Sequence, residues 1–129
     1  MSFLIGFVLA LGVGFIAYAV GLDRERAFFP TVTIVIGTYY VLFAVMAGSV
    51  PTIGVELVLM LAFAAAGIAG FRTTQWVIVA ALAGHGLLDL VHGYLIDNPG
   101  VPGFWPGFCL AFDVVLSAFL ACRLLSWFR

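Results

Sequence analysis

The chain has 129 residues, of which 65% are hydrophobic and only 9% carry a charge, and its formal net charge is −1. Soluble domains devote roughly 25% of their residues to charged side chains. This composition therefore excludes a water-soluble domain, a disordered chain and a secreted disulfide scaffold. The small net charge also gives no reason to expect a nucleic-acid partner. The sequence predicts an integral membrane protein that is surrounded by membrane lipids.

Five apolar segments are long enough to cross a hydrocarbon core of ~30 Å, which takes ~20 helical residues. In chain order they cover residues 3–22, 28–47, 52–71, 74–96 and 106–127. Pro30, Pro51 and Pro106 each stand near the start of a segment, where a helix tolerates proline. We expect an all-α bundle of five transmembrane helices that forms a single domain over residues 1–129.

The basic residues predict how this bundle is oriented. All five are arginines, and with five spans they fall on one side: Arg24, Arg26, Arg72, Arg123 and Arg129. Basic residues concentrate on the cytoplasmic side of membrane proteins. We therefore expect a cytoplasmic C-terminus and an N-terminus outside. On the same side, we expect the charged run 23–26 to be a solvated loop whose charges neutralise each other.

Four ionisable side chains of the last two spans lie inside the predicted membrane region, where charge is costly and faces the bundle interior. His85, Asp89 and His92 stand at positions i, i+4 and i+7 of one helix and share a narrow stripe. Asp113 lies seven residues into the last span, at the same depth as Asp89. We expect these four residues to form one polar cluster in the outer half of the membrane.

Two further residues are second-rank members of this cluster. Cys109 lies one turn from Asp113 on the same face of the last span, and Glu56 lies in the third span at about the depth of His92. The outer loop 97–106 contains three prolines and is expected to cover the cluster as a lid. Either Tyr39 or Tyr40 is expected to hydrogen-bond into it.

The cluster is open to three interpretations. His85, Asp89, His92 and Asp113 offer mixed nitrogen and oxygen ligands for a divalent transition metal such as zinc or iron. The same groups are suited to acid–base catalysis without a metal. Alternatively, the histidines and carboxylates only form hydrogen bonds between helices and stabilise the bundle.

Three functions follow from these interpretations. The first is a membrane enzyme with an outward-opening metal-binding or acid–base site. The second is an accessory subunit of a larger membrane complex, or a homo-oligomer, because short loops leave almost the whole chain in lipid. The third is a proton- or ion-coupled carrier, which is less favoured because the sequence contains no internal repeat.

Three motifs follow one another in the last third of the chain. They are the run His85–His92 with its His-x3-Asp-x2-His spacing, then Val101-Pro102 and Trp105-Pro106, then the Cys-x3-Asp spacing of Cys109–Asp113. This order resembles a family of small bacterial multi-span membrane proteins of unknown function. The resemblance implies a multi-pass protein of the bacterial inner membrane and marks the cluster as a signature of the family. It implies no reaction.

Overall fold

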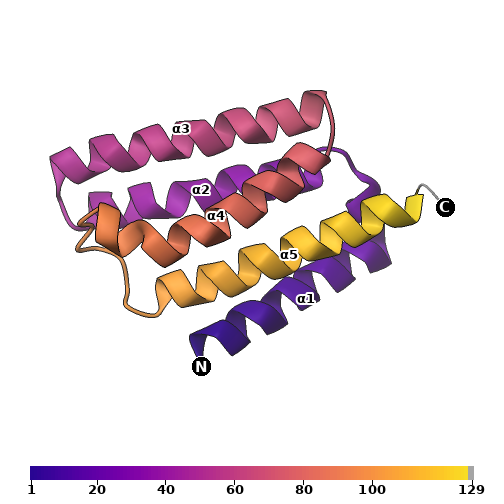
Figure 1. The fold of residues 1–129 in the computed structure, drawn as a ribbon, viewed down its shortest axis with the longest axis horizontal. Coiled ribbons are helices and arrows are strands. Elements are labelled where there is room, and N and C mark those ends of the chain that lie inside the picture. Colours follow the sequence, from indigo (N-terminus) through magenta and orange to yellow (C-terminus); the bar gives the residue numbers. More distant parts are fainter. Residues whose placement is uncertain (128–129) are drawn as a thin grey trace.

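In the computed structural model, which describes residues 1–127, five long helices run back and forth along one axis (Figure 1). They are α1 (Ser2–Val20), α2 (Phe28–Met46), α3 (Val50–Arg72), α4 (Trp76–Leu95) and α5 (Trp105–Trp127), and a short 3₁₀ turn, η1 (Leu22–Arg24), follows α1. All five helices are long and apolar enough to cross a membrane. The prediction of an all-α fold with five such helices is confirmed, and every boundary lies within two residues of its predicted place.

Glycine and proline residues set several of these boundaries. Gly21 ends α1 in the left-handed conformation, with φ of 82°, and its N–H donates to the carbonyl of Tyr18. Only glycine adopts this conformation without strain, so a left-handed glycine is a common helix stop. Pro51 stands in the first turn of α3, where its missing N–H leaves no hydrogen bond unmade.

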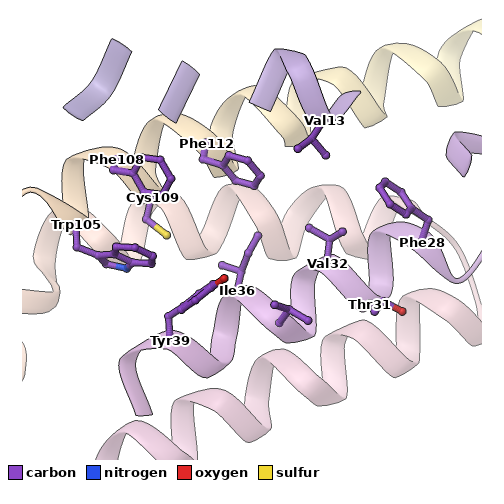
Figure 2. A pocket seen from close by; sticks show the side chains of 11 residues that line it. Val13, Phe28, Thr31, Val32, Ile36, Tyr39, Trp105, Phe108, Cys109 and Phe112 are labelled. Atoms are coloured by element: carbon purple, nitrogen blue, oxygen red, sulfur yellow. The ribbon is translucent and has the colours of Figure 1, made fainter. Parts of the chain in front are cut away.

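The helices pack in a definite order. α5 lies between α1 and α4, α2 packs against α3, and α4 contacts α3 and α2 (Figure 1). Among the described helices, the backbone of α2 approaches that of neither α1 nor α5, and large side chains such as Phe29 and Phe119 make the contacts between α2 and α5. A cavity of about 460 Å³ lies between α1, α2 and α5 (Figure 2).

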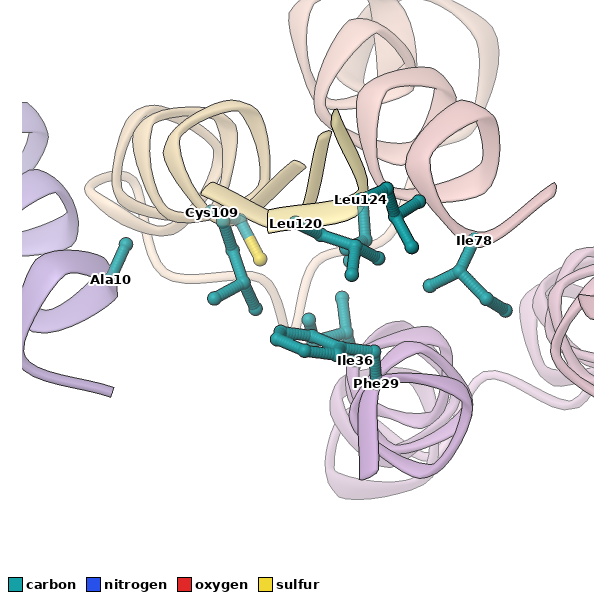
Figure 3. Close-up of a cluster of buried hydrophobic side chains, with 9 residues drawn as sticks. Ala10, Phe29, Ile36, Ile78, Cys109, Leu120 and Leu124 are labelled. Carbon is teal, nitrogen blue, oxygen red and sulfur yellow. The ribbon is translucent and has the colours of Figure 1, made fainter. Parts of the chain in front are cut away.

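An apolar core fills the half of the bundle nearest the α3–α4 turn. Ile78 and Leu82 of α4 meet Leu116 and Leu120 of α5, and Phe29 of α2 closes this core (Figure 3). Each of these five side chains is buried. Between membrane-spanning helices such side chains stabilise the bundle by van der Waals packing, because lipid tails are as apolar as the core.

One end of the bundle carries the arginines, and we call it the arginine end. Arg24, Arg26, Arg72 and Arg123 lie there, in or beside η1, the α3–α4 turn and the last turns of α5, whereas Arg129 lies outside the described residues. The other end, with the α2–α3 and α4–α5 loops, is the arginine-free end. The four described arginines therefore have the one-sided distribution that five spans predict.

The charged run 23–26 is a solvated loop only in part, because Arg24, Glu25 and Arg26 are exposed but Asp23 is buried. Asp23 is only 2% exposed, and its Oδ2 accepts a hydrogen bond from Arg123 Nε at 2.6 Å. Arg26 donates to the carbonyls of Thr73, at 2.7 Å, and Phe71. Asp23 and Arg26 thus find partners far away in the chain. They can do so because the carbonyl ends of three helices converge at the arginine end.

Candidate functional site

Four buried donor groups meet between α4 and α5. His85 and Asp89 come from α4, and Cys109 and Asp113 come from α5. One ligand atom from each of the four lies within 4.8 Å of the others, and no side chain among them is more than 3% exposed. Three of the four belong to the cluster predicted from the sequence, and Cys109 is one of its second-rank members.

Helix geometry explains why these four residues converge. On each helix the two residues are four positions apart, so they share one face. Gly86 lets that face of α4 approach α5 closely, because a Cβ at this position would lie 3.1 Å from Val114 Cγ2 and 3.4 Å from the Leu110 carbonyl oxygen. A larger residue at position 86 would therefore tend to separate the two helices.

Hydrogen bonds hold part of each carboxyl group. His85 Nδ1 lies 2.7 Å from Asp113 Oδ2 and 3.6 Å from Asp89 Oδ2. Tyr40 of α2 donates from its hydroxyl to Asp89 Oδ1 at 2.5 Å, which confirms that one of the two tyrosines reaches the cluster. Asp89 Oδ2 and Asp113 Oδ1 have no hydrogen-bond partner within residues 1–127. The site therefore presents two buried acceptor oxygens to an additional group.

His92 and Glu56 form a separate pair nearer the arginine-free end. His92 Nε2 lies 2.7 Å from Glu56 Oε1, and both residues are at most 2% exposed. The structure thus does not bring His92 and Glu56 into the group of four. Seven residues of helix correspond to roughly 10 Å along the axis, so His85 and His92 are too far apart to hold one metal ion.

Asn98, which sequence reasoning missed, ties the α4–α5 loop to this second pair. Its Nδ2 donates to Glu56 Oε1 at 2.8 Å and to the carbonyl of Tyr40 at 3.0 Å. Two residues later, a Cβ at Gly100 would overlap the carbonyl of Phe43, so only glycine fits there. The loop therefore closes over the His92–Glu56 pair. An Asn-Pro-Gly run signals a turn, but no signal in it shows that the asparagine points inward.

Tyr40 connects the two groups. Its hydroxyl binds Asp89, while its ring stacks on that of His92 with centroids 3.9 Å apart and planes 18° apart. On the α3 side, the ring of Phe63 packs edge-on against His85 at a centroid distance of 4.7 Å. Aromatic rings thus separate the group of four from the second pair and shield both.

No protein-family model, curated protein or solved structure matches this chain. The resemblance of its last third to a family of small bacterial membrane proteins therefore stays a prediction.

Proposed function

We propose that His85, Asp89 and Asp113 bind one divalent transition metal, zinc first and iron second, within the membrane, and that Cys109 borders the fourth position. We propose further that this metal centre is the active site of a small membrane enzyme. The observation that carries the proposal is the convergence of the four buried donors within 4.8 Å. Three protein ligands and one open position are typical of catalytic zinc sites.

The spacing of the donors supports this proposal. Ligand atoms around tetrahedral zinc are roughly 3.3–3.8 Å apart, given bonds of about 2.0–2.3 Å. His85 Nδ1 and Asp89 Oδ2 already lie 3.6 Å apart. His85 Nδ1 and Asp113 Oδ2, now 2.7 Å apart, have to separate by roughly 0.6–1.1 Å to admit the ion.

The charge of the group also supports a divalent cation. Two buried carboxylates beside a neutral imidazole carry two negative charges, which are costly in a membrane. A divalent ion compensates both charges and supplies partners for the unpaired oxygens of Asp89 and Asp113. Tyr40 holds the other oxygen of Asp89 in place, as an outer-shell residue orients a metal ligand.

Metal analysis of two matched histidine variants tests the proposal. The protein is purified in mild detergent without chelator or histidine tag, and its metal content is measured by mass spectrometry. His85→Ala is expected to remove a stoichiometric metal, whereas His92→Ala, an equally buried histidine on the same helix, is expected to keep it. A folded wild-type protein without metal, or equal losses in both variants, would refute the proposal.

A second candidate function is acid–base catalysis without a metal. Two short hydrogen bonds favour it: Tyr40 to Asp89 at 2.5 Å, and His85 to Asp113 at 2.7 Å. A chain of such groups moves protons between a histidine and a carboxyl group. A stable, metal-free protein whose function depends on both aspartates would favour this candidate over the metal centre.

We also propose that the C-terminus is cytoplasmic and the N-terminus outside, in a bacterial inner membrane. Four arginines at one end of the bundle support this orientation. A green fluorescent protein fused to the C-terminus is then expected to fluoresce, and a fused alkaline phosphatase is expected to be inactive. The opposite pair of results would reverse the topology and place the metal centre in the cytoplasmic half.

A further inference from the structure

The cavity between α1, α2 and α5 runs along the helices rather than across them. Its lining on α2 extends from Phe28 to Tyr39, eleven steps of helix or roughly 16 Å. Thr31 and Val35 of this lining are exposed, so the cavity opens sideways from the bundle. Its volume of about 460 Å³ falls in the range of ordinary ligand pockets, roughly 300–1,000 Å³.

The cavity is mainly apolar, with its polar groups near the two ends. Toward the arginine end it is lined by the apolar side chains of Phe28, Val32 and Val13, and Thr31 stands at its exposed edge. Toward the arginine-free end, Tyr39 directs its hydroxyl into the cavity and Cys109 directs its sulfur there (Figure 2). A polar group of a bound molecule therefore finds two partners together at the arginine-free end.

Trp105 closes the polar end of the cavity. Its ring lines the cavity and packs on Tyr39 with centroids 5.0 Å apart. Its Nε1 has no hydrogen-bond partner in the described chain, but protein atoms cover it, so this N–H does not face the cavity. The hydroxyl of Tyr39, which both donates and accepts, is the polar group that a molecule in the cavity reaches.

Cys109 joins this cavity to the candidate metal centre. It belongs both to the cavity lining and to the group of four donors. A molecule in the cavity whose polar end reaches Trp105 and Tyr39 therefore ends next to the cluster. Only the side chain of Cys109 belongs to both sites.

We infer that the cavity binds one hydrocarbon chain of an ester lipid, which enters sideways from the bilayer and presents its carbonyl to the Tyr39 hydroxyl beside the proposed metal centre. The inference deepens the proposed function and rests on it for the role of the cluster. In a bilayer, lipid acyl chains surround an apolar cavity that opens sideways between membrane-spanning helices. The substrate class is accordingly an acyl-chain lipid, with the ester group nearest Cys109.

Photolabelling tests this inference. The protein is reconstituted in phosphatidylethanolamine–phosphatidylglycerol vesicles that contain a small fraction of phosphatidylcholine with a diazirine in one acyl chain. Labelled residues are mapped by mass spectrometry. Labels are expected to concentrate on cavity residues of α2 and α5, and Val32→Trp, which fills the cavity, is expected to lower them about tenfold. Val58 of α3 is 67% exposed and lies outside the cavity, so Val58→Trp is the matched control and is expected to leave the labelling unchanged.

Tyr39→Phe tests the polar contact separately, because it removes the hydroxyl and keeps the aromatic ring. A fatty acid methyl ester is used as a competitor of the photolabel, beside an alkane of equal length. In the variant, the ester is expected to compete about fivefold less well, as the loss of one hydrogen bond of ~1 kcal/mol implies, and the alkane equally well. Equal effects on both competitors would overturn the assignment of the carbonyl to Tyr39.

The outcomes separate this inference from the proposed function. Metal content and thermal unfolding are measured on the same samples, so a misfolded variant is recognised. A metal-loaded protein with labels spread evenly over α1 and α3 overturns the cavity assignment and leaves the metal centre standing. Labels confined to the cavity of a metal-free protein support the lipid chain and refute the metal. A change in oligomeric state on Val32→Trp alone would show that a second copy fills the cavity, against the inference.

Discussion

His85 and His92 lie on one helix, seven residues apart, and each is 2% exposed. Each places a ring nitrogen 2.7 Å from a carboxylate oxygen of another helix. By burial, partner type and distance the two pairs are equivalent. They differ in what surrounds them.

Around His85 the structure places a second carboxyl group and a thiol, and two carboxylate oxygens there have no partner within residues 1–127. Around His92 it places the amide of Asn98, which donates to the same oxygen of Glu56, and the stacked ring of Tyr40. One carboxylate oxygen there, Glu56 Oε2, has no partner in the described chain. An excess of acceptors suits a cation, whereas a donor beside the His–Glu pair suits a structural link. The same pair of residue types is thus suited to binding a cation in one place and attaches a loop in the other.

The largest expected difference between the two pairs is in metal content. Asp113→Asn removes a charged ligand, so we expect metal affinity to fall by more than the ~100-fold that loss of an outer-shell partner reaches. Glu56→Gln, the same chemical change in the other pair, should keep the metal. Metal per chain after dialysis is the measurement. Loss of metal in Glu56→Gln would show that the two pairs act together.

The second-largest expected effect is on stability, and here a change in the His92–Glu56 pair has the effect. His92→Ala leaves Glu56, which is 1% exposed, without its ring partner, and we expect a loss of about 3 kcal/mol in the free energy of unfolding. Unfolding in mixed detergent micelles measures it. The double variant Glu56→Ala/His92→Ala should lose less than the sum of the two single variants, because no charge is then left buried. If the losses of the two single variants simply add up in the double variant, His92 and Glu56 do not stabilise each other directly.

Tyr40 sharpens the comparison because it serves both pairs. Tyr40→Phe keeps the ring on His92 and removes the hydroxyl from Asp89. We expect about tenfold weaker metal binding and a loss of about 1 kcal/mol of stability. Titration with zinc in a competing chelator measures the affinity. The matched variant Tyr39→Phe should leave the affinity unchanged, and an equal effect of both would count against the orienting role of Tyr40.

The smallest expected effect concerns the loop. Asn98→Ala removes the hydrogen bonds to Glu56 and to the Tyr40 carbonyl, and we expect a loss of about 1 kcal/mol with metal content unchanged. Hydrogen exchange is expected to rise in the loop 96–104 and to stay the same in the middle of α5. Faster exchange throughout α5 would mean that the loop also supports the group of four.

The amino-acid sequence by itself determined the five helices and the height of each ionisable group along them. Hydropathy and the proline and glycine stops set the helix ends, because a membrane fixes the length of a span. The spacing of His85 and Asp89, together with the antiparallel course of α4 and α5, put Asp113 at their level. These features depend only on the rise per residue and the number of spans, which are local properties.

Only the tertiary structure decided which groups meet. The pairing of His92 with Glu56, the inward turn of Asn98, the ion pair of Asp23 with Arg123 and the cavity beside Cys109 all depend on how each helix is rotated about its axis. Those rotations are set by packing between residues far apart in the chain. Gly86 against α5 and Gly100 under Phe43 are two such contacts. A helical pattern places a residue along the axis and on a face of its helix. Which neighbour this face contacts depends on the packing of the whole bundle.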